Sequence, residues 1–120
     1  MGGQTILIVD DEPDLREILV DFLSTNYRCI EAENGLEALK ILETETPQLI
    51  ITDLKMPVMD GIEFLSKLDS KFENTPKIAI TAYTNTSKNQ LPEGTELIFK
   101  PFEADQILDA ITRCFLPRYG

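Results

Sequence analysis

The chain has 120 residues, of which 42% are hydrophobic, and it carries a formal net charge of -10. This size corresponds to one domain with an ordinary core, and the acidic balance disfavours direct binding to nucleic acid or to an anionic membrane. The absence of His excludes His-based catalysis, while Cys29 and Cys114 form no metal-ligand pattern and are expected in the core. No apolar run approaches a membrane span and no targeting segment is recognisable, so we expect a cytoplasmic protein.

The first part of the chain alternates apolar runs with amphipathic segments. The run Thr5–Val9 predicts a strand, and Pro13 suits the first turn of the helix that follows. Apolar residues recur in that helix with the spacing of one buried face, at Leu15, Ile18, Leu19, Phe22 and Leu23. A second strand is expected over Arg28–Ala32, with Asn34-Gly35 as the turn after it.

The centre of the chain contains a short apolar run with an acid at its end. After a helix lined by Ala38, Leu39 and Leu42, the run Gln48–Thr52 indicates a strand buried on both faces, as in a parallel sheet. Asp53 follows it directly. Burying an unpaired carboxylate is costly, so Asp53 is either a functional group or an ordinary turn or cap aspartate, and this stretch alone favours neither.

The second half continues the alternation with one exception. Asp60 is a plausible N-cap for a helix that carries Ile62, Leu65, Leu68 and Phe72. Strands are predicted at Lys77–Thr81 and Thr95–Phe99, before a last helix that is stopped by Pro117 and carries Ala104, Leu108, Ile111 and Phe115. Between these strands, Tyr83–Glu93 consists of weak helix formers with only Leu91 as an apolar anchor, which favours a loop or a single turn.

This order of elements predicts an α/β fold. Strands that alternate with helices indicate one doubly wound five-stranded parallel sheet, in the flavodoxin-like order 2-1-3-4-5, with the fourth helix short or missing. In such sheets ligands bind at the carboxyl ends of the strands, near the point where the strand order reverses.

Polar residues collect at that predicted edge: Asp10, Asp11, Asp53, Thr81 and Lys100. Neighbouring strands lie roughly 4.8 Å apart, so the acids and Thr81 can converge. The strand of Lys100 lies two places from that of Asp53, and a long flexible lysine can cover much of that gap. Each residue alone has an ordinary explanation, such as a strand end or a surface charge, but their joint placement favours a site.

The chemistry of this set indicates phosphoryl transfer. Three carboxylates repel one another unless a cation is present, and oxygen ligands without His or Cys suit Mg²⁺. A carboxylate nucleophile beside a metal ion, a lysine and a hydroxyl can attack phosphorus in line while the cations neutralise the transferring oxygens.

The same residues carry a resemblance to the receiver domains of two-component response regulators, over nearly the whole length of the chain. The matching motifs, in order, are Ile-Val-Asp-Asp-Glu (8–12), Asp-Leu-Lys-Met-Pro-Val-Met-Asp-Gly (53–61), Ile-Thr-Ala (80–82) and Phe-Lys-Pro-Phe (99–102). The resemblance implies a receiver domain over residues 1–120. We expect no output domain after the last helix, so the chain is either a stand-alone receiver or a piece of a larger regulator or hybrid kinase, and the sequence favours neither. The resemblance also implies a signalling module rather than an enzyme.

By the same resemblance, Asp53 is the phosphoacceptor. Mg²⁺ would be held by the side chains of Asp11 and Asp53, by the backbone carbonyl of Lys55, and by Asp10 through water. Thr81 and Lys100 would contact the phosphoryl group.

The resemblance further implies that the backbone N–H of Ala82 faces a phosphoryl oxygen and that Lys100-Pro101 is a cis peptide. The implied partners are a histidine kinase or a histidine phosphotransfer protein, and we expect a monomer.

Two departures from the family concern the usual output face, formed there by the fourth helix, fifth strand and last helix. The family usually has an aromatic residue where this chain has Leu97, and the segment from Thr81 to Lys100 is about one helical turn short.

Two other function classes fit the sequence less well. Aspartate-nucleophile phosphatases have Asp-x-Asp after the first strand, whereas this chain has adjacent acids at Asp10-Asp11. An unphosphorylated scaffold would not need the complete set of site residues.

Overall fold

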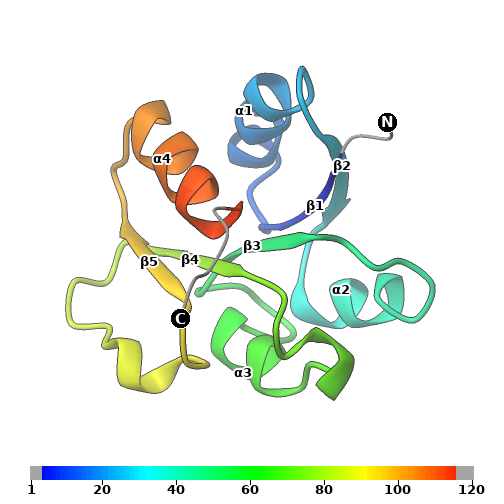
Figure 1. Ribbon diagram of the computed structural model, residues 1–120. Coiled ribbons are helices and arrows are strands. Elements are labelled where there is room, and N and C mark those ends of the chain that lie inside the picture. The colour runs from blue at the N-terminus through cyan, green and yellow to red at the C-terminus, as the bar shows by residue number, and fades with distance from the viewer. Residues whose placement is uncertain (1–3, 116–120) are drawn as a thin grey trace, which may run out of the picture.

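A computed structural model describes residues 4–115 of the chain. Five parallel strands form one sheet in the order β2-β1-β3-β4-β5 (Figure 1). Their bounds are β1 Thr5–Val9, β2 Arg28–Ala32, β3 Leu49–Asp53, β4 Lys77–Thr81 and β5 Glu96–Phe99. The predicted fold class and strand order are therefore confirmed.

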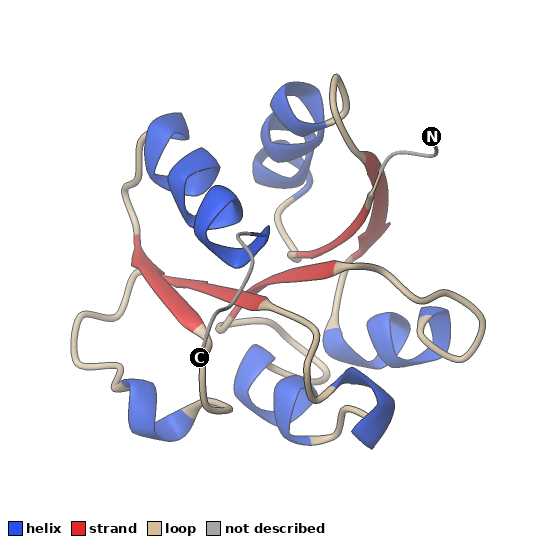
Figure 2. Cartoon of the chain, in the orientation of Figure 1, coloured by secondary structure: helices blue, strands red, loops and turns tan. Residues whose placement is uncertain are grey.

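Four α-helices flank the sheet within the described residues, with α1 and α4 on one face and α2 and α3 on the other. Their bounds are α1 Pro13–Leu23, α2 Gly35–Ile41, α3 Gly61–Ser66 and α4 Ala104–Phe115. Figure 2 shows the strands as one layer between these two layers of helices, with loops joining strands to helices. Among the described helices, none has the length and apolar content that crossing a bilayer would need.

The core has two halves because successive strand residues point to opposite faces of the sheet. The half under α1 and α4 is rich in isoleucine, with Ile6, Ile8, Ile51, Ile78, Ile80 and Ile107. The half under α2 and α3 contains Leu7, Val9, Ile50, Phe64, Leu65 and Ala79. Every residue of β3 is buried, as the continuous apolar run predicted. Cys29 and Cys114 are partly buried against the isoleucine-rich half.

The third helix is shorter than its apolar spacing predicted. α3 ends at Ser66, and a separate 3₁₀ turn, η1, covers Ser70–Phe72. The reason is local, because the Asp69 side chain accepts a hydrogen bond from the backbone N–H of Lys71 and starts the new turn. Phe72 still reaches the core, so the periodicity located the buried residue but not the break before it.

Asn34 and Gly35 also differ from the prediction, because they begin helix α2 instead of forming a separate turn. The Asn34 side chain accepts a hydrogen bond from Glu37 N at 2.8 Å, which makes it the N-cap. Strand β3 extends through Asp53 and β5 begins at Glu96, one residue later than predicted in each case. Asp60 caps α3 as predicted, whereas Pro117 lies outside the described residues.

The segment between β4 and β5 forms only one 3₁₀ turn, η2 Lys88–Gln90, and contains no α-helix. Ser87 and Gln90 form a capping box that defines this turn. Leu91 is 8% exposed and is the residue of this segment that joins the core. The prediction of a short or missing fourth helix is confirmed, since one apolar anchor supports only one turn.

Candidate functional site

Three aspartates meet at the carboxyl end of the sheet. Asp53 is the last residue of β3, and Asp10 and Asp11 follow β1, the strand next to it. A carboxylate oxygen from each lies within 4.8 Å of one from both others. Asp10 and Asp53 are buried, at 1% and 4% exposure, while Asp11 is partly exposed. Strand topology thus brings together the three acids that the sequence predicted.

Short backbone turns hold two of these carboxylates. Asp10 Oδ1 accepts a hydrogen bond from Glu12 N at 2.9 Å, and Asp53 Oδ1 accepts one from Lys55 N at 2.9 Å. These bonds offset part of the cost of burying a carboxylate. Burial nevertheless raises the pKa of Asp10 to about 6; the hydrogen bond from Glu12 opposes this rise, and the charge of Asp53 adds to it.

Lys100 reaches the acids from the far side, as its length predicted. Its Nζ lies 2.5 Å from Asp53 Oδ2 and 3.4 Å from Glu12 Oε1. Burial lowers the pKa of Lys100, but the hydrogen bond and charge of Asp53 outweigh burial, so the net shift is upward. The Lys100-Pro101 peptide is cis, as the resemblance implied.

Thr81 ends β4, the neighbour of β3 on the other side, and it is buried. Its hydroxyl oxygen accepts a hydrogen bond from Tyr83 N at 3.1 Å, and Ala82 between them is exposed. The Lys55 ammonium lies 5.7 Å from the centre of the Tyr83 ring. Thr81, Lys55 and Tyr83 line a cavity of about 280 Å³ that extends toward the helix-poor segment.

The loop between β3 and α3 is tightly folded. Met59 N donates to Pro57 O at 2.7 Å, and Val58 between them has a φ of 68°. This is a γ-turn with a β-branched residue at its centre, which is an unfavourable conformation for valine. Val58 is 74% exposed, so its side chain projects into solvent.

Close glycine contacts fix both ends of this loop. Gly35 N donates to Met59 O at 3.2 Å, and Gly61 N donates to Leu54 O at 3.0 Å. A Cβ atom at Gly61 would lie 2.3 Å from the backbone oxygen of Asp53. Glycine at position 61 therefore lets α3 begin directly against the strand end that carries Asp53.

Sequence reasoning did not single out Glu12 or Arg16. Glu12 is the N-cap residue of α1, and its side chain contacts Lys100 instead of capping the helix. Arg16 Nη1 donates to the backbone oxygen of Asp10 at 2.7 Å. One sequence feature could have identified Arg16. It is a cation near the N-terminus of a helix that follows three acids, a position that the helix dipole disfavours for a cation.

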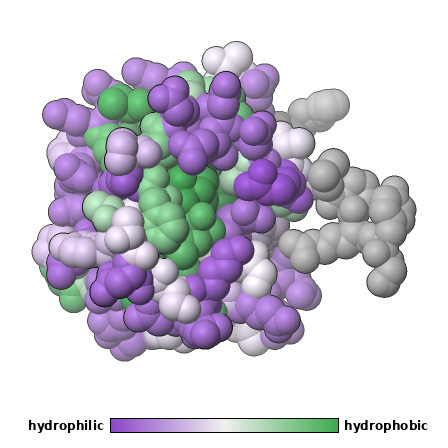
Figure 3. All heavy atoms as spheres, turned by 90° about the vertical axis from the view of Figure 1, so that its left-hand side faces the viewer, coloured by the Kyte–Doolittle hydropathy of each residue, from purple (hydrophilic) through white to green (hydrophobic). Residues whose placement is uncertain are grey.

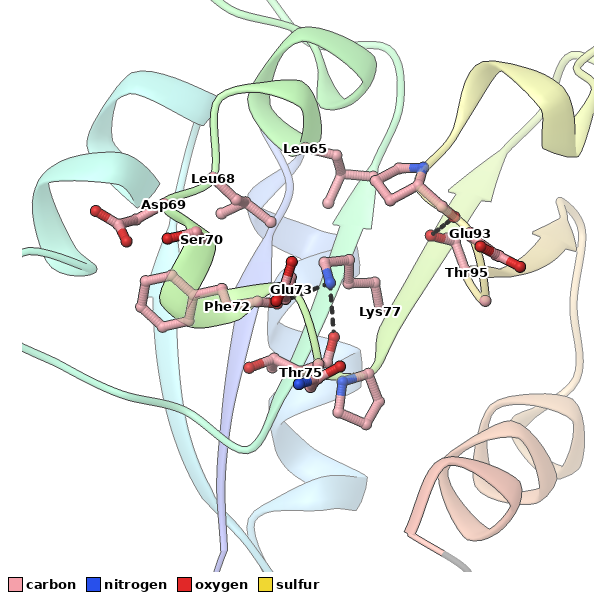
Figure 4. A pocket seen from close by; sticks show the side chains of 14 residues that line it. Leu65, Leu68, Asp69, Ser70, Phe72, Glu73, Thr75, Lys77, Glu93 and Thr95 are labelled. Atoms are coloured by element: carbon pink, nitrogen blue, oxygen red, sulfur yellow. Dashed lines mark hydrogen bonds between the residues drawn. The ribbon is translucent and has the colours of Figure 1, made fainter. Parts of the chain in front are cut away.

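A second cavity, of about 910 Å³, lies at the opposite, amino end of the sheet. It opens between the α3–β4 connection and the Pro92–Thr95 stretch, and Lys77 at the start of β4 lies in it (Figure 4). None of the predicted site residues lines this cavity. The acid cluster and this cavity are therefore separate features.

The family assignment rests on a match along almost the entire chain. The sequence model of the response regulator receiver domain matches residues 6–112. The chain belongs to this family. Receiver domains are signalling modules of two-component systems that are phosphorylated and that partner with histidine kinases and phosphotransfer proteins, so the resemblance read from the motifs is confirmed.

Relatives of this receiver domain include short proteins and parts of longer ones. Sporulation initiation phosphotransferase F of Bacillus subtilis is 39% identical over 123 residues, which cover 98% of this chain and 97% of the relative. The receiver domain of a signal transduction histidine kinase from Syntrophus aciditrophicus has a TM-score of 0.87 and 28% identity, covering 98% of this chain and 96% of that one. Response regulator TrrA of Thermotoga maritima, solved in complex with Mg²⁺-BeF, has a TM-score of 0.80 and 32% identity. The match covers 93% of this chain and 99% of that one.

Proposed function

We propose that Asp53 accepts a phosphoryl group from a phosphohistidine of a histidine kinase or histidine phosphotransfer protein. The observation that carries this proposal is the position of Asp53, which ends the buried strand β3 in contact with Lys100 and beside two further acids. A carboxylate oxygen of Asp53 would attack phosphorus as the phosphorus–nitrogen bond breaks. The bonding electron pair would return to the imidazole.

The acid cluster fits a hard divalent cation, because its ligands are carboxylate oxygens and the chain has no His. We assign Mg²⁺ to the side chains of Asp11 and Asp53 and the backbone carbonyl of Lys55, with Asp10 acting through water. When bound, Mg²⁺ would neutralise charge on the transferring oxygens. The Mg²⁺-BeF complex of the Thermotoga regulator supports this assignment.

The remaining site residues would act on the phosphoryl group. Lys100 is already paired with Asp53 and would donate to a phosphoryl oxygen once that pair opens. The Thr81 hydroxyl and the Ala82 N–H would donate to other phosphoryl oxygens. Because Thr81 Oγ1 accepts a bond from Tyr83 N and donates none among residues 4–115, its proton is available for this contact.

We further propose that the domain is a cytoplasmic monomer that meets its partner around the site and α1. Ile18 on α1 is 55% exposed and supports an apolar contact there, while the charge of -10 argues against nucleic acid. The Bacillus relative is named a phosphotransferase, which favours a phosphorelay role for this chain.

The test is phosphorylation with Mg²⁺ and acetyl phosphate, followed by intact mass. The wild type should gain one phosphoryl group and Asp53→Asn none. Asp60→Asn is the matched control, because it changes an exposed N-cap aspartate outside the cluster and should still be labelled. Unchanged labelling of Asp53→Asn would refute the assignment, and turnover of small phosphate esters would favour the phosphatase class.

A further inference from the structure

Arg16 joins three elements next to the acid cluster. From α1, its Nη1 donates to the backbone oxygen of Asp10 at 2.7 Å, and its Nε donates to Glu31 Oε1 on β2 at 3.1 Å. The Arg16 side chain is 17% exposed. One guanidinium thus connects the β1–α1 loop, helix α1 and strand β2.

The carbonyl that Arg16 binds belongs to the peptide between Asp10 and Asp11. Holding this peptide plane restricts the directions of both carboxylates, since one side chain leaves the chain on each side of it. The backbone of Arg16 is also fixed, because its N–H donates to Glu12 O at 3.0 Å. The planar guanidinium can serve two acceptors in a defined geometry, which a flexible ammonium group cannot.

The position of Arg16 is unusual for a purely structural arginine. Near the N-terminus of a helix a cation is electrostatically disfavoured by the helix dipole, and Glu31 is largely exposed, so that ion pair contributes little. The bond to the Asp10 carbonyl is the short, shielded contact of this side chain. Its favourable contribution therefore lies at the acid cluster.

We propose that Arg16 is a positioning residue, which holds the Asp10-Asp11 peptide so that both carboxylates face the same cation as Asp53. It acts through the backbone and touches neither the cation nor the phosphoryl group. The inference rests on the Mg²⁺ assignment made above and adds to it a residue outside the ligand set.

The test is calorimetric titration with Mg²⁺ of the wild type, Arg16→Met, Arg16→Lys and Glu31→Gln. Loss of contacts that orient ligands typically weakens metal binding about tenfold or more, so Arg16→Met should raise the Kd for Mg²⁺ by about tenfold. Glu31→Gln removes the ion-pair charge but keeps the bond to Asp10, so its Kd should stay within about twofold of wild type. The Kd of Arg16→Lys should fall between those of Arg16→Met and Glu31→Gln. If Arg16→Met does not fold, Arg16→Lys takes its place in the test.

Urea unfolding without Mg²⁺ separates positioning from stability. A purely structural role predicts that Arg16→Met loses stability but binds Mg²⁺ with the wild-type Kd. This result would overturn the positioning role of Arg16 and leave the Mg²⁺ assignment intact. If the wild type itself does not bind Mg²⁺, the cation assignment fails and the inference fails with it.

Discussion

Two ends of the same pair of strands bury charge in opposite ways. At the amino end of β4, the 5% exposed Lys77 donates from Nζ to the backbone oxygens of Phe72 at 2.9 Å and Thr75 at 2.8 Å (Figure 4). At the carboxyl end of β3, Asp53 lies against two like charges, Asp10 and Asp11. The hydrogen-bond partners of Lys77 are two neutral carbonyl groups, whereas Asp53 lies beside two like charges with one cation, Lys100, against it.

The difference separates a structural charge from a functional one. Carbonyl groups satisfy Lys77 within the fold, where it ends the η1 turn as a cation at a helix C-terminus does. Among the described residues, Lys100 is the cation that forms an ion pair with a carboxylate of the cluster, so three negative charges face one positive charge and their arrangement is favourable mainly when a further cation binds. Burial of an ionisable group therefore indicates function when its neighbours carry the same charge.

The largest expected effect concerns pH at the acid end. Because the pKa of Asp10 rises from 3.8 to about 6 in the fold, the folded state must carry a disfavoured charge above that pH. Without divalent cations, stability should fall as pH rises between these values, by up to about 3 kcal/mol from this residue. Asp10→Asn keeps the acceptor for Glu12 N and should remove the effect.

Urea unfolding in EDTA across this pH range measures the difference between wild type and Asp10→Asn. The variant should match the wild type near pH 4 and exceed it in stability near neutrality. A difference that does not vary with pH would contradict the repulsive character of this end.

Cation binding should produce the next largest effect. Mg²⁺ at a hundred times its Kd should stabilise the wild type by about 2.7 kcal/mol through mass action. Asp11→Ala should abolish this gain while leaving the metal-free protein as stable or more stable, since it removes a repelling charge. Thermal unfolding with and without Mg²⁺ measures both, and a gain that survives in Asp11→Ala would show that Asp11 does not serve the metal.

Lys77→Met should destabilise the protein by about 2 kcal/mol, because it removes the Nζ donor from the Thr75 carbonyl and one of two donors from the Phe72 carbonyl, which keeps the bond from Thr75 N. The gain from Mg²⁺ should stay at the wild-type value, since Lys77 lies at the other end of the sheet. Lys40→Met, at an exposed lysine on α2, is the control and should change stability little. If Lys77→Met changed the response to Mg²⁺, the two ends would not be independent.

The smallest effect is expected on the face of β5 and α4. Figure 3 shows an apolar strip there among polar side chains, and Phe99 and Leu108 are exposed on these elements. Leu97 occupies the place of the family's usual aromatic ring and is partly buried, so a beryllofluoride mimic should shift amide signals around Asp53, Ala82 and Lys100 more than on this face.

Sedimentation should show a monomer with and without the mimic, and Leu97→Tyr should enlarge the shifts on the β5–α4 face. Large wild-type shifts centred on Leu97, or a change from monomer to dimer, would refute this prediction.

Strand topology made most of the site predictable. The acids and Lys100 end strands or follow them, and parallel strands bring such positions to one edge. The contacts of Arg16 and Glu12 depend on rotamers of a helix and its cap, which periodicity does not specify. Lys77 begins a strand, where a lysine is usually exposed, and only the fold of the η1 turn around it shows its burial. The break after α3 was not predicted, because Leu68 and Phe72 have the spacing of one continuous helix. The Asp69 cap, which starts a separate turn, does not alter that spacing.

The tightly folded loop after Asp53 lowers the conformational entropy that is lost when a partner binds. The γ-turn at Val58 and the hydrogen bonds of Gly35 and Gly61 order this loop when the chain folds. Its conformational entropy is therefore lost at folding, and little remains to be lost when another protein docks beside the site. Because Val58 is held in the open by this ordered backbone, it offers a preorganised apolar contact, so transient complexes can form and separate without first ordering the loop.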